Sequence, residues 1–105
     1  MKGNCYEVAG RMVMDNDLMV LCHGLATGSG PLKGQLIAHA WCELGDEVFD
    51  YSDGKHFVGR KEKYYEIGKI TKVVKYSALE ACKLMLKTGH FGPWDNSVSL
   101  DWLKK

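Results

Sequence analysis

A cysteine, a histidine and an aspartate in the first half of the chain have types and surroundings that could do chemistry. Cys5 follows Asn4, a suitable N-cap, so we expect the thiol in the first turn of a helix. The unpaired backbone N–H groups and the helix dipole favour an anion at that place, and the thiolate is the nucleophilic form of cysteine. Cys5 is therefore a candidate nucleophile. The alternative is a small apolar residue that fills a gap beneath the helix.

His39 lies in the run 38–43, within the segment 35–44 that we expect to form the first strand of a hairpin. The alternation of side chains along a strand places His39, Trp41 and Glu43 on one face. Small alanines flank the imidazole and leave room for a helix to approach. His39 is a candidate general base, and the alternative is an ordinary hydrogen-bonded histidine of the core or surface.

Asp50 is expected on the second strand of this hairpin. The Gly-Asp pair at 45–46 favours a tight turn. With this turn, Trp41 faces Asp50 and His39 faces Ser52, so Asp50 is the diagonal neighbour of His39 on the same face. Its carboxylate could bind one imidazole nitrogen and leave the other for the thiol. A shift of one residue in register would reverse this facing, and Asp50 would then be a solvated acid at a strand end.

The order of these residues resembles the transglutaminase-like branch of the papain-like cysteine peptidase superfamily, in particular its small bacterial and phage-type members. That family carries a nucleophilic cysteine at a helix start, a histidine in a His-Ala-Trp-hydrophobic-Glu strand, and an aspartate on the adjoining strand. The resemblance covers about positions 4 to 52. It implies Cys5 as the nucleophile, His39 as general base and then general acid, and Asp50 as the group that orients the imidazole.

The resemblance also implies an oxyanion hole, in which the backbone N–H of the cysteine is joined by a donor from a side chain. Gln35, Asn4 and Trp94 are the candidate donors. The helical elements that usually precede the nucleophile in this family are not found before Cys5. Trp94 has a second possible role, shared with Trp102, in packing the C-terminal segment onto the sheet.

Three functions are compatible with these residues. The resemblance implies a cysteine-dependent acyl-transfer enzyme that hydrolyses a peptide or amide bond in a peptide, protein or other amide-containing substrate, through a thioester and without a cofactor. The alternative is a non-catalytic binding or inhibitory module that keeps the fold and holds a partner in its groove or on its edge strands. A redox or thiol-sensor protein would need a second cysteine near Cys5.

The elements that must position these residues alternate in an α+β order. The spacing predicts a helix over 4–15, strands over 18–24, 35–44, 47–52, 64–68 and 70–76, and loops over 26–31 and 53–62. Ser77 with Glu80 three residues later predicts a capped helix that ends at Thr88-Gly89. We therefore expect a single papain-like domain over residues 1–105, in which an N-terminal helix carrying the cysteine packs on an antiparallel sheet, with a C-terminal helix.

Composition excludes several classes of partner. Lys and Arg number 14 and Asp and Glu 13, which gives a formal net charge of +1, so we expect no nucleic-acid binding. The longest apolar runs fall far short of the ~20 residues that span a bilayer. Because no apolar leader follows Met1, we expect a cytoplasmic protein that is not bound to membranes.

The four cysteines, at positions 5, 22, 42 and 82, are expected to be free thiols, since a reducing compartment is favoured over two disulfides. Apolar neighbours favour a core position for Cys42 and Cys82. Cys22 and His23, taken with Cys42 and His56, match no zinc-ligand spacing, so no metal site is predicted.

Overall fold

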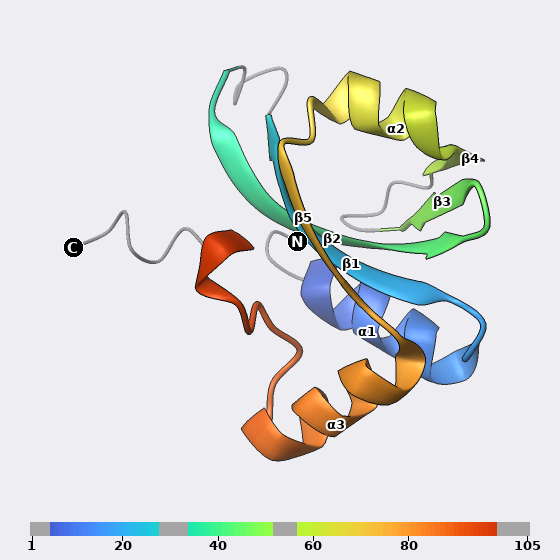
Figure 1. Ribbon diagram of the computed structural model, residues 1–105, viewed down its shortest axis with the longest axis vertical. Helices are drawn as coiled ribbons and strands as arrows, with labels where there is room; N and C mark the ends of the chain where they lie inside the picture. Colours follow the sequence, from blue (N-terminus) through green and yellow to red (C-terminus); the bar gives the residue numbers. More distant parts are fainter. Residues whose placement is uncertain (1–4, 28–33, 52–56, 99–105) are drawn as a thin grey trace.

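The computed structural model describes residues 5–27, 34–51 and 57–98, and its elements form an α+β arrangement (Figure 1). The helices are α1 (Cys5–Asp15), α2 (Lys61–Gly68), α3 (Ala78–Thr88) and the short 3-10 helix η3 (Asn96–Val98). The strands are β1 (Val20–Thr27), β2 (Leu36–Leu44), β3 (Glu47–Asp50), β4 (Phe57–Arg60) and β5 (Lys72–Tyr76). The predicted α+β class is confirmed, with a helix that begins the described chain and further helices after the sheet begins.

The strands form one antiparallel sheet in the order β4-β3-β2-β1-β5. The predicted tight turn joins β2 to β3, and Gly45 takes the positive φ of 60° that such a turn needs. Leu44 pairs with Glu47 and Cys42 with Phe49, so the predicted register of this hairpin is confirmed.

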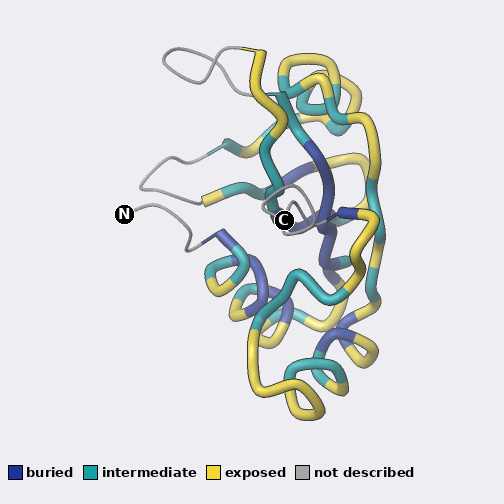
Figure 2. Tube along the Cα trace, turned by 90° about the vertical axis from the view of Figure 1, so that its left-hand side faces the viewer, coloured by how far each residue is buried: buried dark blue, intermediate teal, exposed yellow. Residues whose placement is uncertain are grey.

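Helices cover both faces of the sheet, with α1 and α3 on one face and α2 on the other (Figure 1). Cys5, Ala9 and Val13 recur every four residues and form the buried stripe of α1. This stripe packs on Ala40 and Cys42 of β2. Figure 2 shows the buried positions gathered along the central strands and on the sheet-facing side of α1.

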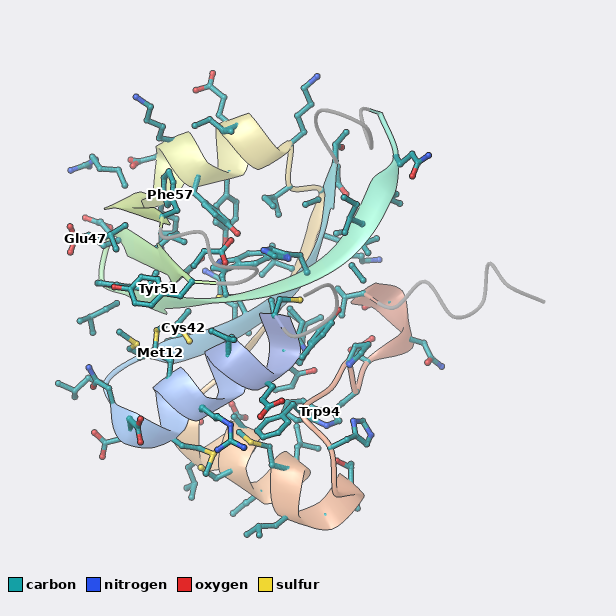
Figure 3. All side chains as sticks on the ribbon, turned by 180° about the vertical axis from the view of Figure 1, so that it is seen from behind. Met12, Cys42, Glu47, Tyr51, Phe57 and Trp94 are labelled. Atoms are coloured by element: carbon teal, nitrogen blue, oxygen red, sulfur yellow. The ribbon has the colours of Figure 1, made fainter. Side chains whose placement is uncertain are left out.

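The opposite face of β2 carries the second core. Trp41 and Val48 are fully buried and pack against Tyr64 and Tyr65 of α2. In Figure 3, Met12 and Cys42 lie between α1 and the sheet, whereas Phe57 lies on the side of α2. β2 thus separates two apolar layers, as its predicted alternation requires.

The prediction of a strand over 64–68 is wrong, because these residues lie in α2. The charged run before Tyr64 consists of good helix formers. The helix ends where Lys69 adopts a left-handed conformation (φ 48°) and its N–H bonds the carbonyl groups of Tyr65 and Glu66. Paired tyrosines suit a strand in isolation, but the two hydroxyls find carboxylate partners in the sheet only from the helix.

Smaller differences concern where strands begin and end. Residues 57–60, expected in a loop, form β4 and pair with β3, because they complete the hydrogen bonds of its free edge. Residues 26–27, also expected in a loop, extend β1 against the start of β2. β5 begins at Lys72 rather than at residue 70. β3 ends at Asp50, and Ser52 lies outside the described residues.

The predicted start of α3 is confirmed. Ser77 accepts a hydrogen bond from the backbone of Glu80, and the Glu80 carboxylate accepts one from Ser77 N–H. Gly89 ends the helix with a φ of 76°. The proposed cap of α1, Asn4, lies outside the described residues. None of the helices in the described ranges is long and apolar enough to cross a bilayer.

Candidate functional site

A hydrogen-bonded imidazole–carboxylate pair joins β2 to β3. His39 Nε2 lies 2.8 Å from Asp50 Oδ2, and the two side chains are only 20% and 14% exposed. The hairpin register places Asp50 one residue beyond the Cys42–Phe49 pair, diagonal to His39. The predicted contact between these two side chains is therefore confirmed.

Cys5 stands beside this pair. It is the first residue of α1, so its backbone N–H is one of the four that lack an acceptor within the helix. The residue is 7% exposed and lines a narrow crevice together with Ala40, Trp41 and Asp50. The Cys5 side chain lies beside the His39 ring, close enough to raise the pKa of the imidazole. Because Nε2 is bound to Asp50, Nδ1 is the nitrogen left for the thiol.

The surroundings of His39 favour its charged form. Burial alone would lower the pKa of the imidazole, but the hydrogen bond to Asp50, the nearby Cys5 side chain and the negative charge of the carboxylate outweigh burial and raise it to about 10. At neutral pH the ring is therefore an imidazolium with the Asp50 carboxylate on one side and the Cys5 sulfur on the other.

Trp41 supports the imidazole from within the sheet. Its ring is stacked on that of His39 at 6.2 Å between centroids and 27° between planes. The space for Trp41 depends on Gly24 of β1, where a Cβ atom would stand 2.7 Å from the indole and 2.6 Å from the carbonyl oxygen of Lys72. The orientation of His39 thus depends on a close approach that only glycine allows.

Tyr64 is a member of the site that the sequence did not reveal. Its hydroxyl donates to Asp50 Oδ2 at 2.6 Å, so this oxygen contacts both Tyr64 and His39. Burial and the Asp50 carboxylate raise the pKa of the Tyr64 phenol above its ordinary value, which keeps the hydroxyl a donor. The signal was the Tyr64-Tyr65 pair, but a strand assignment would have sent the two rings to opposite faces.

A second buried carboxylate, Glu43, lies on the same face of the sheet. It accepts hydrogen bonds from Trp41 Nε1 (3.1 Å), Tyr65 OH (2.5 Å) and Lys75 Nζ (2.9 Å), and Lys61 Nζ lies 3.7 Å away. Burial raises the pKa of Glu43, but these donors outweigh it and hold the pKa below its ordinary value. This Glu43 cluster ties α2 and β5 to the C-terminal end of β2.

The structure does not bring the predicted side-chain oxyanion donors to the thiol. Gln35 is exposed just before β2, about 13 Å along the chain from His39 at strand spacing. The single donor of Trp94, Nε1, bonds Thr88 Oγ1 at 3.1 Å and the His90 carbonyl at 3.3 Å. Asn4 lies outside the described residues.

Trp94 instead has the packing role that was its alternative. Its ring lies 5.1 Å from those of both His23 and Tyr76, on the side of the sheet that carries α3 (Figure 3). Trp102 lies outside the described residues.

His23 is fully buried beneath this segment. Tyr6, Tyr76 and Trp94 surround its ring at 4.9 to 5.3 Å between centroids. Among the described residues, neither ring nitrogen has a hydrogen-bond partner, and burial lowers the pKa of the imidazole to about 4. His23 is therefore neutral at physiological pH.

The other thiols are free, as expected, but differ from Cys5 in their surroundings. Burial is the main cause that raises the pKa of Cys22, and it raises that of Cys42 to about 12. The Cys42 thiol also donates to the Ala9 carbonyl at 3.2 Å. Cys82, expected in the core, is only half-buried because it lies at the margin of the sheet-facing stripe of α3. In the described part of the chain, no three His, Cys, Asp or Glu side chains could hold a metal ion together.

Comparisons with family models, with curated proteins and with solved structures find no match to this chain.

Proposed function

We propose that the protein is a cysteine-dependent acyl-transfer enzyme of papain-like, transglutaminase-like architecture, which hydrolyses a peptide or amide bond. The observation that carries this proposal is the hydrogen bond between Asp50 and His39, with Cys5 beside the ring at the start of α1. A nucleophile, a base within hydrogen-bond reach and a third group that orients the base are the signature of an activated nucleophile.

The bond from Asp50 to Nε2 decides the direction of proton transfer. It fixes the ring so that Nδ1 exchanges the proton with the Cys5 sulfur, and the raised pKa of His39, about 10, favours the proton on the ring at neutral pH. The imidazolium then has a proton to deliver as a general acid.

The reaction would run through two displacements. The Cys5 sulfur attacks the acyl carbon and forms a thioester, while the bond to the leaving nitrogen breaks and that nitrogen takes the proton from His39. Water then attacks the thioester and gives one proton to His39. The carboxylic acid leaves, and His39 with the Cys5 thiolate is restored as the imidazolium–thiolate pair that began the cycle.

One oxyanion donor is available in the helix itself. The backbone N–H of Cys5 belongs to the first turn of α1, where the helix offers no acceptor for it and where the dipole favours negative charge. A donor of this kind contributes a factor of about 10² to 10³ in rate.

The surroundings of Cys42 favour acyl transfer over a redox role. Cys42 packs in the same core as Cys5, but its thiol is bonded to a helix carbonyl and its pKa of about 12 keeps it protonated. It is therefore a poor resolving partner for Cys5.

Two measurements test the proposal. Iodoacetamide should label Cys5 at neutral pH faster than the other three cysteines, because Cys5 alone among the described cysteines lies beside an imidazole of the described residues. p-Nitrophenyl acetate should leave an acetyl group on Cys5, detected by mass spectrometry of peptides. Labelling of Cys5 no faster than that of any of the other three cysteines would overturn the proposal.

The variant Cys5→Ala separates this enzyme from a binding module. It should abolish acylation entirely and keep the fold, as judged by circular dichroism. A function in partner binding that survives Cys5→Ala unchanged, without any acylation of the natural protein, would instead support the module.

A further inference from the structure

We propose that Tyr64 is a positioning residue, whose hydroxyl holds the Asp50 carboxylate in the orientation that binds His39. The inference rests on the proposed function, since it concerns how the same site is held in its working geometry.

Two donors meet at one oxygen of Asp50. Tyr64 OH lies 2.6 Å from Oδ2 and His39 Nε2 lies 2.8 Å from it. The two donors come from different layers, one from α2 above the sheet and one from β2 within it. A carboxylate on two rotatable bonds has few orientations that satisfy both, so the phenol limits the rotation of the acid that binds the imidazole.

Tyr64 is itself held in place without Asp50. Its ring contacts those of Trp41 and Phe57, at 5.3 and 5.1 Å between centroids. The helix that carries it is tied to the sheet at its first residue, where Lys61 N–H bonds the Asp46 carbonyl at 2.7 Å. The hydroxyl therefore approaches the carboxylate from a fixed point, as a positioning group must.

Tyr65 supplies a matched control. It is the next residue of the same helix, and its hydroxyl also donates to a buried carboxylate, that of Glu43. Tyr64→Phe and Tyr65→Phe each remove one oxygen and one charge-assisted hydrogen bond from α2. A loss of helix docking would affect both variants alike, whereas a loss of Asp50 orientation would affect only Tyr64→Phe.

The test is the titration of His39 followed by NMR in the full chain, together with the rate at which iodoacetamide labels Cys5. In Tyr64→Phe the Asp50 carboxylate can turn away, so we expect the titration of His39 to move down by about one pH unit. The labelling rate should fall about tenfold. In Tyr65→Phe the titration of His39 should stay at its natural position. The melting temperature of Tyr65→Phe should fall by about as much as that of Tyr64→Phe.

Three results would overturn the positioning role. Equal shifts in the two variants would mean that the hydroxyl only stabilises α2. An upward shift in Tyr64→Phe would mean that the hydroxyl only weakens the attraction between the Asp50 carboxylate and the imidazolium, and that other contacts hold the carboxylate. No shift of the His39 titration would mean that Asp50 keeps its orientation without the Tyr64 hydroxyl.

The variant Asp50→Asn completes the test. If Tyr64 acts through Asp50, adding Tyr64→Phe to Asp50→Asn should not move the His39 titration further. The NMR readout does not depend on turnover, so the two proposals fail separately. Slow labelling of Cys5 in the natural protein would reject the enzyme, whereas an unchanged titration in Tyr64→Phe would reject the positioning role.

Discussion

His23 and His39 lie on adjacent strands, one position apart in the register, since His23 pairs with Ala40 and Gly24 pairs with His39. This single step sends the two rings to opposite faces of the sheet. His23 enters a box of aromatic rings beneath the C-terminal segment, whereas His39 lies between a carboxylate and a thiol.

Burial acts on both rings in the same direction, because it disfavours the charged imidazole. For His23 nothing opposes it, and the pKa falls to about 4. For His39 the hydrogen bond to Asp50 and the nearby Cys5 side chain outweigh it, and the pKa rises to about 10. A strand histidine is thus made chemically inert or chemically useful by its neighbours, and being buried does not decide between the two.

The largest expected effect is on acyl transfer. His39→Ala removes the group that takes and returns the proton, so acetylation of Cys5 by p-nitrophenyl acetate should slow by about 10³-fold. His23→Phe keeps a ring of similar shape in the aromatic box and should leave this rate within about twofold of the natural protein. Comparable losses in two folded variants would contradict the division between the histidines.

Acid should destabilise the protein through His23. The folded-state pKa of His23 is depressed to about 4 from the ordinary 6.5, so the unfolded chain binds the proton more readily. The stability it contributes is complete above about pH 6.5 and is lost as the pH falls through 4, with a total of about 3 kcal/mol. Urea unfolding at several pH values measures this loss.

His23→Phe removes the titrating group and serves as the control for this acid effect. Its stability should fall less between pH 6.5 and 4 than that of the natural protein. An identical pH dependence in the two proteins would show that other groups cause the acid sensitivity.

The contribution of His39 to the free energy of unfolding should be lost at high pH, whereas that of His23 is lost at low pH. Because its folded-state pKa is raised, its contribution is complete below pH 6.5 and is lost as the pH rises through about 10. The difference in unfolding free energy between the natural protein and His39→Ala, measured from pH 7 to 10, should therefore shrink with increasing pH. A constant difference would contradict the paired state of the ring.

The smallest effects concern two glycines, one beside each histidine. A Cβ at Gly24 would press on Trp41, on which His39 is stacked, and one at Gly92 would stand 2.5 Å from the His23 ring. Each change to alanine should cost about 2 kcal/mol of unfolding free energy, measured in urea. Only Gly24→Ala should also slow the labelling of Cys5, and equal labelling in both variants would show that the stacking on Trp41 does not orient His39.

The hairpin that carries His39 and Asp50 could be predicted because its signals are local. The Gly-Asp turn sets the register, and alternation sets the faces, so the contact at 2.8 Å follows from a count along the chain. The cap of α3 at Ser77 was predictable for the same reason, since both of its hydrogen bonds join residues three apart.

The rest of the site depends on contacts between distant residues. Tyr64 and Tyr65 favour a strand by local preference, and only their carboxylate partners in the sheet make a helix the better choice. The box around His23 could not be predicted because it requires Trp94, from a segment whose conformation has no local signal. The approach of Cys5 to His39 depends on how α1 packs on Ala40 and Cys42.

The position of the two buried sheet thiols provides a natural probe of motion. Cys42 lies beneath α1, and Cys22 lies in the layer beneath α2. A reagent can reach each sulfur only when the helix above it separates from the sheet, so slow labelling of Cys42 and Cys22 would report the opening of each layer. The labelling rate of Cys42 thus measures the opening of the helix that carries the nucleophile, and that of Cys22 measures the opening of the helix that carries Tyr64.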